Sequence, residues 1–211
     1  MHFRNTLVAV LVVMLAPVGC NVYQSHGYGK APKGSAAATP LYLPETAPSI
    51  SQRFRTEFAS SKYEHRGFDI LVPSGTPVLA AADGRVSDVS TSVLYGRQVM
   101  LDHAATAEGF RIQTRYFHLA QPLVEAGERV RRGQLIARSG ASGMAGGFPH
   151  LHFEVHQLVD ETSSVTLRVL DPQLFWVDGA GRVTCFDKAH DWPRTPVTLT
   201  YPVPCQGQAW Q

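Results

Sequence analysis

The sequence has little net charge, no long apolar run and no lysine between residues 70 and 175, and each shortage excludes a class of protein. Lysine and arginine number 19 against 17 aspartate and glutamate, so the net charge of +2 gives no electrostatic footprint for nucleic acid. The longest apolar run, residues 7–16, is too short for a membrane span, which needs about 20 residues. Lysine is absent from residues 70–175, which excludes a biotinyl- or lipoyl-carrier domain because that module needs a modifiable lysine.

What remains is material for one domain with tails, since 44% of the 211 residues are hydrophobic. Short strand-like segments separated by Gly, Pro and Asp recur from Phe68 onward, and no segment keeps a helical period. The pattern predicts an all-β, antiparallel domain. The expected strands are residues 68–72, 78–81, 84–89, 97–102, 111–119, 130 with 135–137, and 151–157.

The most informative segment is residues 150–156, where polar and apolar residues alternate. Successive strand residues face opposite sides, so His150, His152, Glu154 and His156 share one face while the residues between them enter a core. Neutral imidazole is the commonest protein ligand for zinc, and a further imidazole beside a metal is well placed to move protons. This strand therefore predicts a metal site.

Further ligands lie upstream, where His65 and Asp69 flank Gly67, a residue that permits a close approach of the backbone. Three nitrogen and oxygen ligands plus one water are typical of a catalytic zinc site. His65, Asp69 and one histidine of residues 150–156 complete such a set. The His-x-x-x-Asp spacing alone is a weak motif, and its combination with the histidine-rich strand makes it informative.

A third segment, residues 111–119, also alternates as a strand, and it places Tyr116 and His118 on one face. With this segment the chain resembles the lysostaphin/LytM-type zinc endopeptidases, which cut peptide bonds in bacterial cell walls. The resemblance rests on residues 65–69, 116–119 and 150–154. It extends to the connecting segments 73–78, 82–86, 127–134 and 140–143, and it covers roughly residues 50–175.

The resemblance implies a compact antiparallel β-sandwich-like domain with zinc in a groove above the sheet. It implies that His65, Asp69 and His152 bind Zn²⁺ and that His118 and His150 are the catalytic pair. Peptides of peptidoglycan are then the expected substrate. We expect His150 to act as the base and His118 as the donor to the oxyanion, although the sequence leaves the two roles open to exchange.

One alternative is a non-catalytic protein that binds the wall and activates a peptidoglycan amidase. Such relatives lose ligand or catalytic residues, whereas all five are present here, so the enzyme is favoured. Glu154 and His156 are candidates for the shell outside the metal ligands, where carboxylates orient ligating histidines. No regulatory protein partner is identified by the sequence.

The chain divides into a lipoprotein-type signal peptide (1–20), a flexible tether rich in Gly, Ala, Pro and Ser (21–48), the LytM-type domain (49–175) and a C-terminal extension (176–211). Asp171-Pro172-Gln173-Leu174-Phe175 resembles the usual exit from the family domain. The extension is interpreted as either a cap on the domain or a tail that binds a partner. The basic run Arg129, Arg131 and Arg132 is interpreted as a solvated face beside a turn, with anionic wall polymers as the alternative.

The cysteine count favours lipidation of Cys20, because three cysteines in an exported protein leave one without a partner. Val18-Gly19-Cys20 resembles the end of a bacterial lipoprotein signal, although Pro17 stands where that signal usually has leucine. A lipid on Cys20 predicts a membrane-anchored protein of the periplasm, and Asn21 favours the outer membrane. Cys185 and Cys205 are then free to pair.

Overall fold

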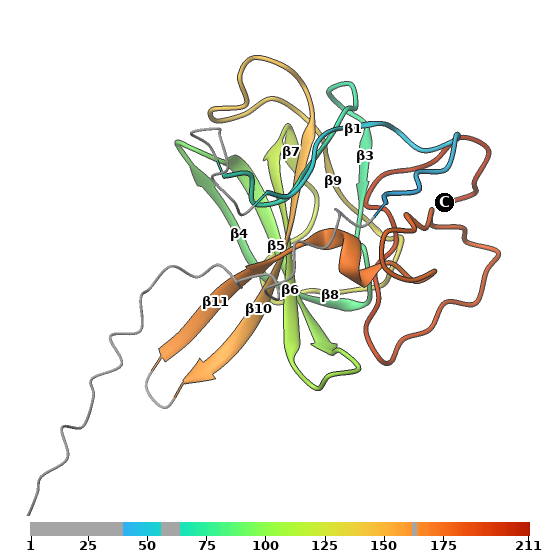
Figure 1. Ribbon diagram of the computed structural model, residues 1–211. Helices are drawn as coiled ribbons and strands as arrows, with labels where there is room; N and C mark the ends of the chain where they lie inside the picture. The colour runs from blue at the N-terminus through green and yellow to red at the C-terminus, as the bar shows by residue number, and fades with distance from the viewer. Residues whose placement is uncertain (1–39, 56–63, 162–163) are drawn as a thin grey trace, which may run out of the picture.

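The computed structural model describes residues 40–55, 64–161 and 164–211, and these residues form antiparallel sheets joined by loops (Figure 1). The prediction of an all-β antiparallel fold is confirmed. The strands are β1 (Ile50–Gln52), β2 (Phe68–Ile70), β3 (Pro77–Leu79), β4 (Gly84–Ser92), β5 (Gly96–Ala105), β6 (Arg111–Leu119), β7 (Gln121–Pro122), β8 (Arg129–Val130), β9 (Leu135–Arg138), β10 (Leu151–Glu161) and β11 (Ser164–Leu170), and a 3₁₀ helix, η1, spans Pro172–Phe175. Nothing helical in the described ranges has the length and apolar character that crossing a membrane requires.

The larger sheet has the strand order β1-β2-β10-β6-β5-β4-β8, with β11 also paired to β10, and the smaller sheet has the order β3-β9-β7. Both sheets contribute to one hydrophobic core, which includes Phe68 and Phe153 from the larger sheet and Val78 and Ile136 from the smaller. Burial of each such side chain contributes about 1.5–3 kcal/mol. β1 and β7 are too short to predict from the sequence, whereas β11 is missing from the predicted strands although its residues alternate between polar and apolar.

The histidine-rich strand, β10, lies at the centre of the larger sheet. Leu151, Phe153 and Val155 are fully buried in the core, as their alternation predicts. β10 pairs with β2 on one side and β6 on the other, so that His152 stands opposite both Asp69 and Phe117 in the register. Residues more than 80 positions apart in the sequence thus meet at one level of the sheet.

The end of β6 departs from regular strand geometry, and the prediction that Tyr116 and His118 share a face is wrong. Tyr116 is buried in the core, where its hydroxyl accepts a hydrogen bond from the Ala81 amide at 2.9 Å. His118 has a φ of 58°, and the register between β5 and β6 shifts between Arg97 and Val99. A left-handed residue beside a register shift breaks the alternation of side chains, so His118 lies on the opposite side from Tyr116.

The C-terminal extension packs against the domain as a cap. Trp176, Leu199 and Tyr201 are among the buried residues of the shared core. Residues 40–48, which the sequence assigns to the tether, also belong to the folded part, because Leu41 and Leu43 pack against the same core. The backbone secures this segment, since the Tyr42 amide donates to the Gly181 carbonyl and Tyr42 accepts from the Val183 amide.

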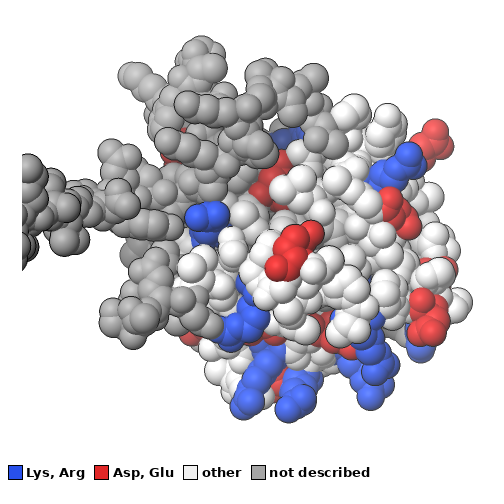
Figure 2. Space-filling model, turned by 60° about the horizontal axis from the view of Figure 1, so that its bottom comes forward, with Lys and Arg blue, Asp and Glu red and all other residues white. Residues whose placement is uncertain are grey.

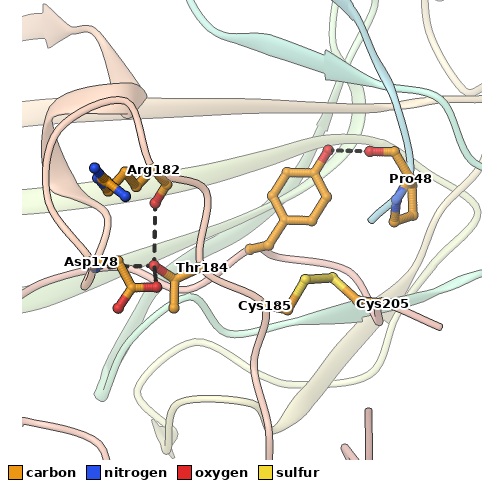
Figure 3. The surroundings of a disulfide bond; sticks show 7 residues. Pro48, Asp178, Arg182, Thr184, Cys185 and Cys205 are labelled. Atoms are coloured by element: carbon orange, nitrogen blue, oxygen red, sulfur yellow. Dashed lines mark hydrogen bonds between the residues drawn. A yellow bond between two sulfur atoms is a disulfide. The ribbon is translucent and has the colours of Figure 1, made fainter. Parts of the chain in front are cut away.

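A disulfide joins Cys185 to Cys205 within the extension, with an S–S distance of 1.94 Å (Figure 3). Beside it the Thr184 hydroxyl lies 3.0 Å from Asp178 Oδ2. The Tyr201 hydroxyl donates to the Pro48 carbonyl at 2.8 Å, which ties the extension to the segment before β1.

Arg132 is not part of a solvated basic face, so that interpretation is corrected for this residue. Its side chain is buried, and its guanidinium donates to the carbonyls of Ala81, Pro193 and Thr198 at 2.8–3.1 Å. Burial lowers the pKa of Arg132 to about 10. Its neighbours Arg129 and Arg131 are exposed.

On the face shown in Figure 2, basic and acidic side chains are interspersed, with the basic ones more frequent along one edge.

Candidate metal centre

Three side chains from two separate segments of the chain converge on one side of the larger sheet. His65 comes from the segment before β2, Asp69 from β2 and His152 from β10. One potential ligand atom from each residue lies within 4.8 Å of those of the other two. His65 Nε2 is 3.0 Å from Asp69 Oδ1, and His152 Nδ1 is 2.6 Å from the same oxygen. The two segments that the sequence paired as ligand sources therefore meet at one oxygen atom.

Gly67 permits this approach. A Cβ at Gly67 would lie 2.2 Å from the Phe153 carbonyl oxygen and 3.0 Å from Glu154 Cγ. Only glycine fits where the chain before β2 crosses so close to β10. The close crossing places His65 and Asp69 on the side of β10 that carries His152.

The donor set fits a cation. His65 Nδ1 lies 3.0 Å from the Arg53 carbonyl, which only accepts, so the neutral ring carries its proton on Nδ1. His65 Nε2 is then a lone pair facing the Asp69 carboxylate at 3.0 Å, and within the described residues this buried nitrogen has no hydrogen-bond partner. Two acceptors held at this distance repel one another, and a metal ion between them removes the repulsion.

The electrostatics of the cluster depend on close pairing. Burial alone would raise the pKa of Asp69, but the hydrogen bond from His152 Nδ1 holds it well below its usual range. Burial alone would lower the pKa of His152, yet its hydrogen bonds to Asp69 and Glu154 raise it to about 9. Metal-free, the cluster thus retains a proton on His152 that a metal ion would displace from Nδ1.

His118 and His150 lie beside this set. The centres of their rings are 4.8 Å apart, and His150 Nε2 is 3.7 Å from Asp69 Oδ1. Each ring donates from Nδ1 to a backbone carbonyl, His118 to Ser142 at 2.9 Å and His150 to Phe148 at 2.8 Å. Both neutral rings therefore keep a lone pair on Nε2. Burial lowers the pKa of His118, which favours its neutral form.

Glu154 and His156 follow His152 on the same face of β10, each two residues further along the strand. Glu154 Oε1 lies 3.0 Å from His152 Nε2, and Glu154 Oε2 lies 2.5 Å from His156 Nε2. Glu154 is 2% exposed and His156 is 3% exposed, so both lie beneath the groove surface. Burial alone would raise the pKa of Glu154. The hydrogen bonds from His152 and His156 outweigh this effect, so the pKa lies below its usual value and the carboxylate stays ionised.

A groove of about 550 Å³ surrounds the cluster, and sequence reasoning missed several residues that line it. Tyr95 stacks on Phe117 with ring centres 4.4 Å apart and lies 6.4 Å from the His152 ring. A tyrosine in a turn carries no metal-binding signature, so only the folded chain places it here. The other lining residues not predicted are Gln52, Glu64, Arg66, Leu94, Met144, Ala145 and Gly146.

One predicted residue, Cys20, and one histidine outside the groove, His103, complete the account. Cys20 lies outside the described residues. His103, a histidine at a strand end, lies away from the groove, where its ring bonds the Asp83 carbonyl at 2.8 Å and the Thr114 hydroxyl at 2.7 Å. It belongs to the packing of the domain.

Comparison with known proteins finds a family whose model matches part of this chain. Residues 63–165 match the family model described as Peptidase family M23. An uncharacterized metalloprotease of Haemophilus influenzae is 47% identical over 93 residues, which cover 44% of this chain and 18% of that protein. The peptidoglycan DD-endopeptidase ShyC of Vibrio cholerae is 35% identical over 134 residues, or 64% of this chain and 29% of that protein. The chain thus spans less than a third of the length of either relative.

Among solved structures, the catalytic domain of the prophage-encoded M23 protein EnpA from Enterococcus faecalis, determined as a mutant, superposes with a TM-score of 0.50. The superposition covers 63% of this chain and 94% of that domain, at 21% sequence identity. At this identity the likeness establishes the fold alone.

Proposed function

Residues 63–165 form a domain of Peptidase family M23, and from this premise we propose that the protein is a zinc-dependent endopeptidase that hydrolyses peptide cross-links of bacterial peptidoglycan. The observation that carries the proposal is the meeting of His65, Asp69 and His152 at one oxygen atom, beside two further histidines in an open groove. The names of the relatives support peptidoglycan as the substrate.

In the proposed site His65 Nε2, Asp69 Oδ1 and His152 Nδ1 would hold the zinc ion. Two imidazoles and one carboxylate leave an open position, as catalytic zinc sites do. Zinc in such a site lowers the pKa of water towards 7 and polarises the scissile carbonyl.

The two remaining histidines supply proton transfer and charge stabilisation. His150 accepts a proton at Nε2, because this nitrogen lies nearest the ligand set, 3.7 Å from Asp69 Oδ1. It then returns the proton to the leaving amine. His118 takes up a proton from solvent at Nε2, becoming an imidazolium, and donates this N–H to the oxygen on which negative charge develops. Because both rings donate from Nδ1 to backbone carbonyls, their Nε2 atoms have the same capacity, and the two roles stay open to exchange.

The groove has walls of different character that suit a peptide substrate. Leu94 and Met144 stand on one side, and both are more than half exposed. Glu64 and Arg66 lie beside the ligand His65 and supply charges of both signs. A cross-link peptide with methyl groups and free carboxylates presents groups that complement both walls.

The expected location is the bacterial cell envelope, with a lipid on Cys20 holding the enzyme at the periplasmic face of the outer membrane within reach of the wall. Several acyl chains anchor a protein stably, whereas one binds only marginally. Intact-mass measurement of the native protein tests this assignment. A chain that begins after residue 20 without added lipid would contradict it.

Digestion of purified peptidoglycan tests the activity. Mass spectrometry of wall fragments should show cross-linked dimers converted to monomers by the full chain with zinc. Alanine at His65, Asp69 or His152 should abolish both the bound zinc and the conversion. Full zinc content in His152→Ala would contradict the ligand assignment, and intact dimers with the unchanged, zinc-loaded chain would contradict the function. None of the observations favours the amidase-activator alternative.

A further inference from the structure

We infer that Glu154 and His156 are positioning residues for the metal site: Glu154 holds Nε2 of His152, which leaves Nδ1 to face the metal, and His156 in turn holds Glu154. This inference rests on the proposed function, and it concerns how the proposed ligand His152 is oriented. It assigns a role to a buried carboxylate and a buried imidazole that the reaction itself does not use.

The geometry forms a continuous chain from the metal position into the sheet. Asp69 Oδ1 lies 2.6 Å from His152 Nδ1, and His152 Nε2 lies 3.0 Å from Glu154 Oε1. The second oxygen of Glu154 then contacts His156 Nε2 at 2.5 Å. Because His152, Glu154 and His156 are spaced two apart on β10, regular strand geometry alone stacks them on one face.

The protonation of these groups follows from their partners. The Glu154 carboxylate only accepts hydrogen bonds, so His152 and His156 must each donate to it from Nε2. A proton fixed on Nε2 of His152 makes Nδ1 the nitrogen that is free to bind a cation. A negative charge on the far side of a ligating imidazole also strengthens the imidazole as a ligand.

Both members of the pair are buried, so their polar groups depend on one another for hydrogen bonds. Glu154 and His156 are 2% and 3% exposed, and a buried carboxylate is costly unless its hydrogen bonds are satisfied. His156 Nδ1 is also buried, and it has no hydrogen-bond partner in the part of the chain that the structure describes. The hydrogen bonds of the pair therefore run through Glu154, which ties the position of this carboxylate to the ring of His152.

Other charged groups lie around the pair without replacing its contacts. Arg115 stands opposite Glu154 in the register of β6, and the charges of Arg115 and Arg66 both act on His156. Both oxygens of Glu154 nevertheless bond to imidazoles. The carboxylate is therefore aimed along the row of β10 towards the ligand.

Zinc affinity of the full chain, measured by competition with a chromophoric chelator, tests the inference. In Glu154→Ala the affinity should fall about 10–100-fold, as is usual when a partner of a ligating histidine is removed. Glu154→Gln retains an acceptor for His152 Nε2 but not the charge, so its loss should be smaller. His156→Ala should also lose affinity, because Glu154 is then held at one oxygen only.

A matched control separates positioning from stability. His103→Ala removes another buried histidine with two hydrogen bonds, but one that lies away from the groove. It should lower the melting temperature and leave zinc affinity unchanged. The absorption spectrum of bound Co²⁺ should change in Glu154→Ala and stay unchanged in His103→Ala.

The outcomes distinguish this inference from the proposed function. If the unchanged chain digests the wall with zinc bound, while Glu154→Ala and His156→Ala bind zinc as tightly as it does, the inference is overturned and the function stands. An equal loss of affinity in His103→Ala would also overturn it, because general destabilisation would then explain every variant. If the unchanged chain binds no zinc, the proposed function fails and the inference fails with it.

Discussion

Replacement of Gly67 by alanine tests whether the close crossing of the chain over β10 creates the metal centre. The added Cβ would lie 2.2 Å from the Phe153 carbonyl oxygen and 2.9 Å from its carbon, whereas real Cβ contacts below 3.0 Å essentially never occur. The two segments must therefore separate by about 1 Å, a distortion of the kind that costs about 1–3 kcal/mol in stability.

This separation falls directly between the proposed ligands, because Gly67 lies between His65 and Asp69 while Phe153 follows His152. Metal–ligand distances tolerate only about 0.2 Å of change, so we expect Gly67→Ala to lose most of its zinc. Wall digestion should fall by about 100-fold, since a misplacement of about 1 Å has that effect on a catalytic site. Elemental analysis, chelator competition and a melting curve measure the three effects.

Gly109→Ala is the matched control. Gly109 has a φ of 85° in the turn between β5 and β6, and a Cβ there meets nothing within 4 Å. The substitution should cost about 1 kcal/mol of backbone strain and leave zinc affinity unchanged. Unaltered zinc affinity in Gly67→Ala, at a melting temperature no lower than that of the control, would refute the reasoning.

Three further predictions concern the two histidines beside the ligands, the disulfide and His103. Alanine at His118 or His150 should leave zinc nearly stoichiometric and reduce turnover by roughly 10²–10⁴-fold, and elemental analysis beside a digestion assay decides this. Reduction of the Cys185–Cys205 disulfide, or serine at both positions, should destabilise the fold by about 3 kcal/mol in urea unfolding with zinc affinity retained; an unchanged midpoint would argue against the cap. Burial lowers the pKa of His103 from 6.5 to about 4, so the unfolded chain takes up a proton first as the pH falls and stability declines through this window. Between about pH 7 and pH 4.5 this residue should account for roughly 2–3 kcal/mol of the decline, which His103→Gln should remove; equal slopes in both proteins would contradict the burial argument.

The all-β fold and the face of β10 follow from local pattern, because alternation of side chains is a property of any strand. His150, His152 and Glu154 share a face for that reason alone. The same rule failed at His118, where a left-handed residue and a shift in register turn the side chain away from Tyr116. No periodic pattern encodes such an irregularity, since it depends on how β5 pairs with β6.

The sequence by itself determined which residue types are available for a metal site and that Gly67 permits a close crossing. Only the tertiary structure decided that β2 and β10 pair in the register that sets His152 opposite Asp69. It also decided which nitrogen of each histidine faces the centre, because the Arg53 carbonyl and the Glu154 carboxylate hold the other nitrogens. A local sequence pattern does not show which backbone or side-chain group lies beside each histidine nitrogen. It also does not show that β2 pairs with β10, because the paired residues Asp69 and His152 are more than 80 positions apart in the sequence.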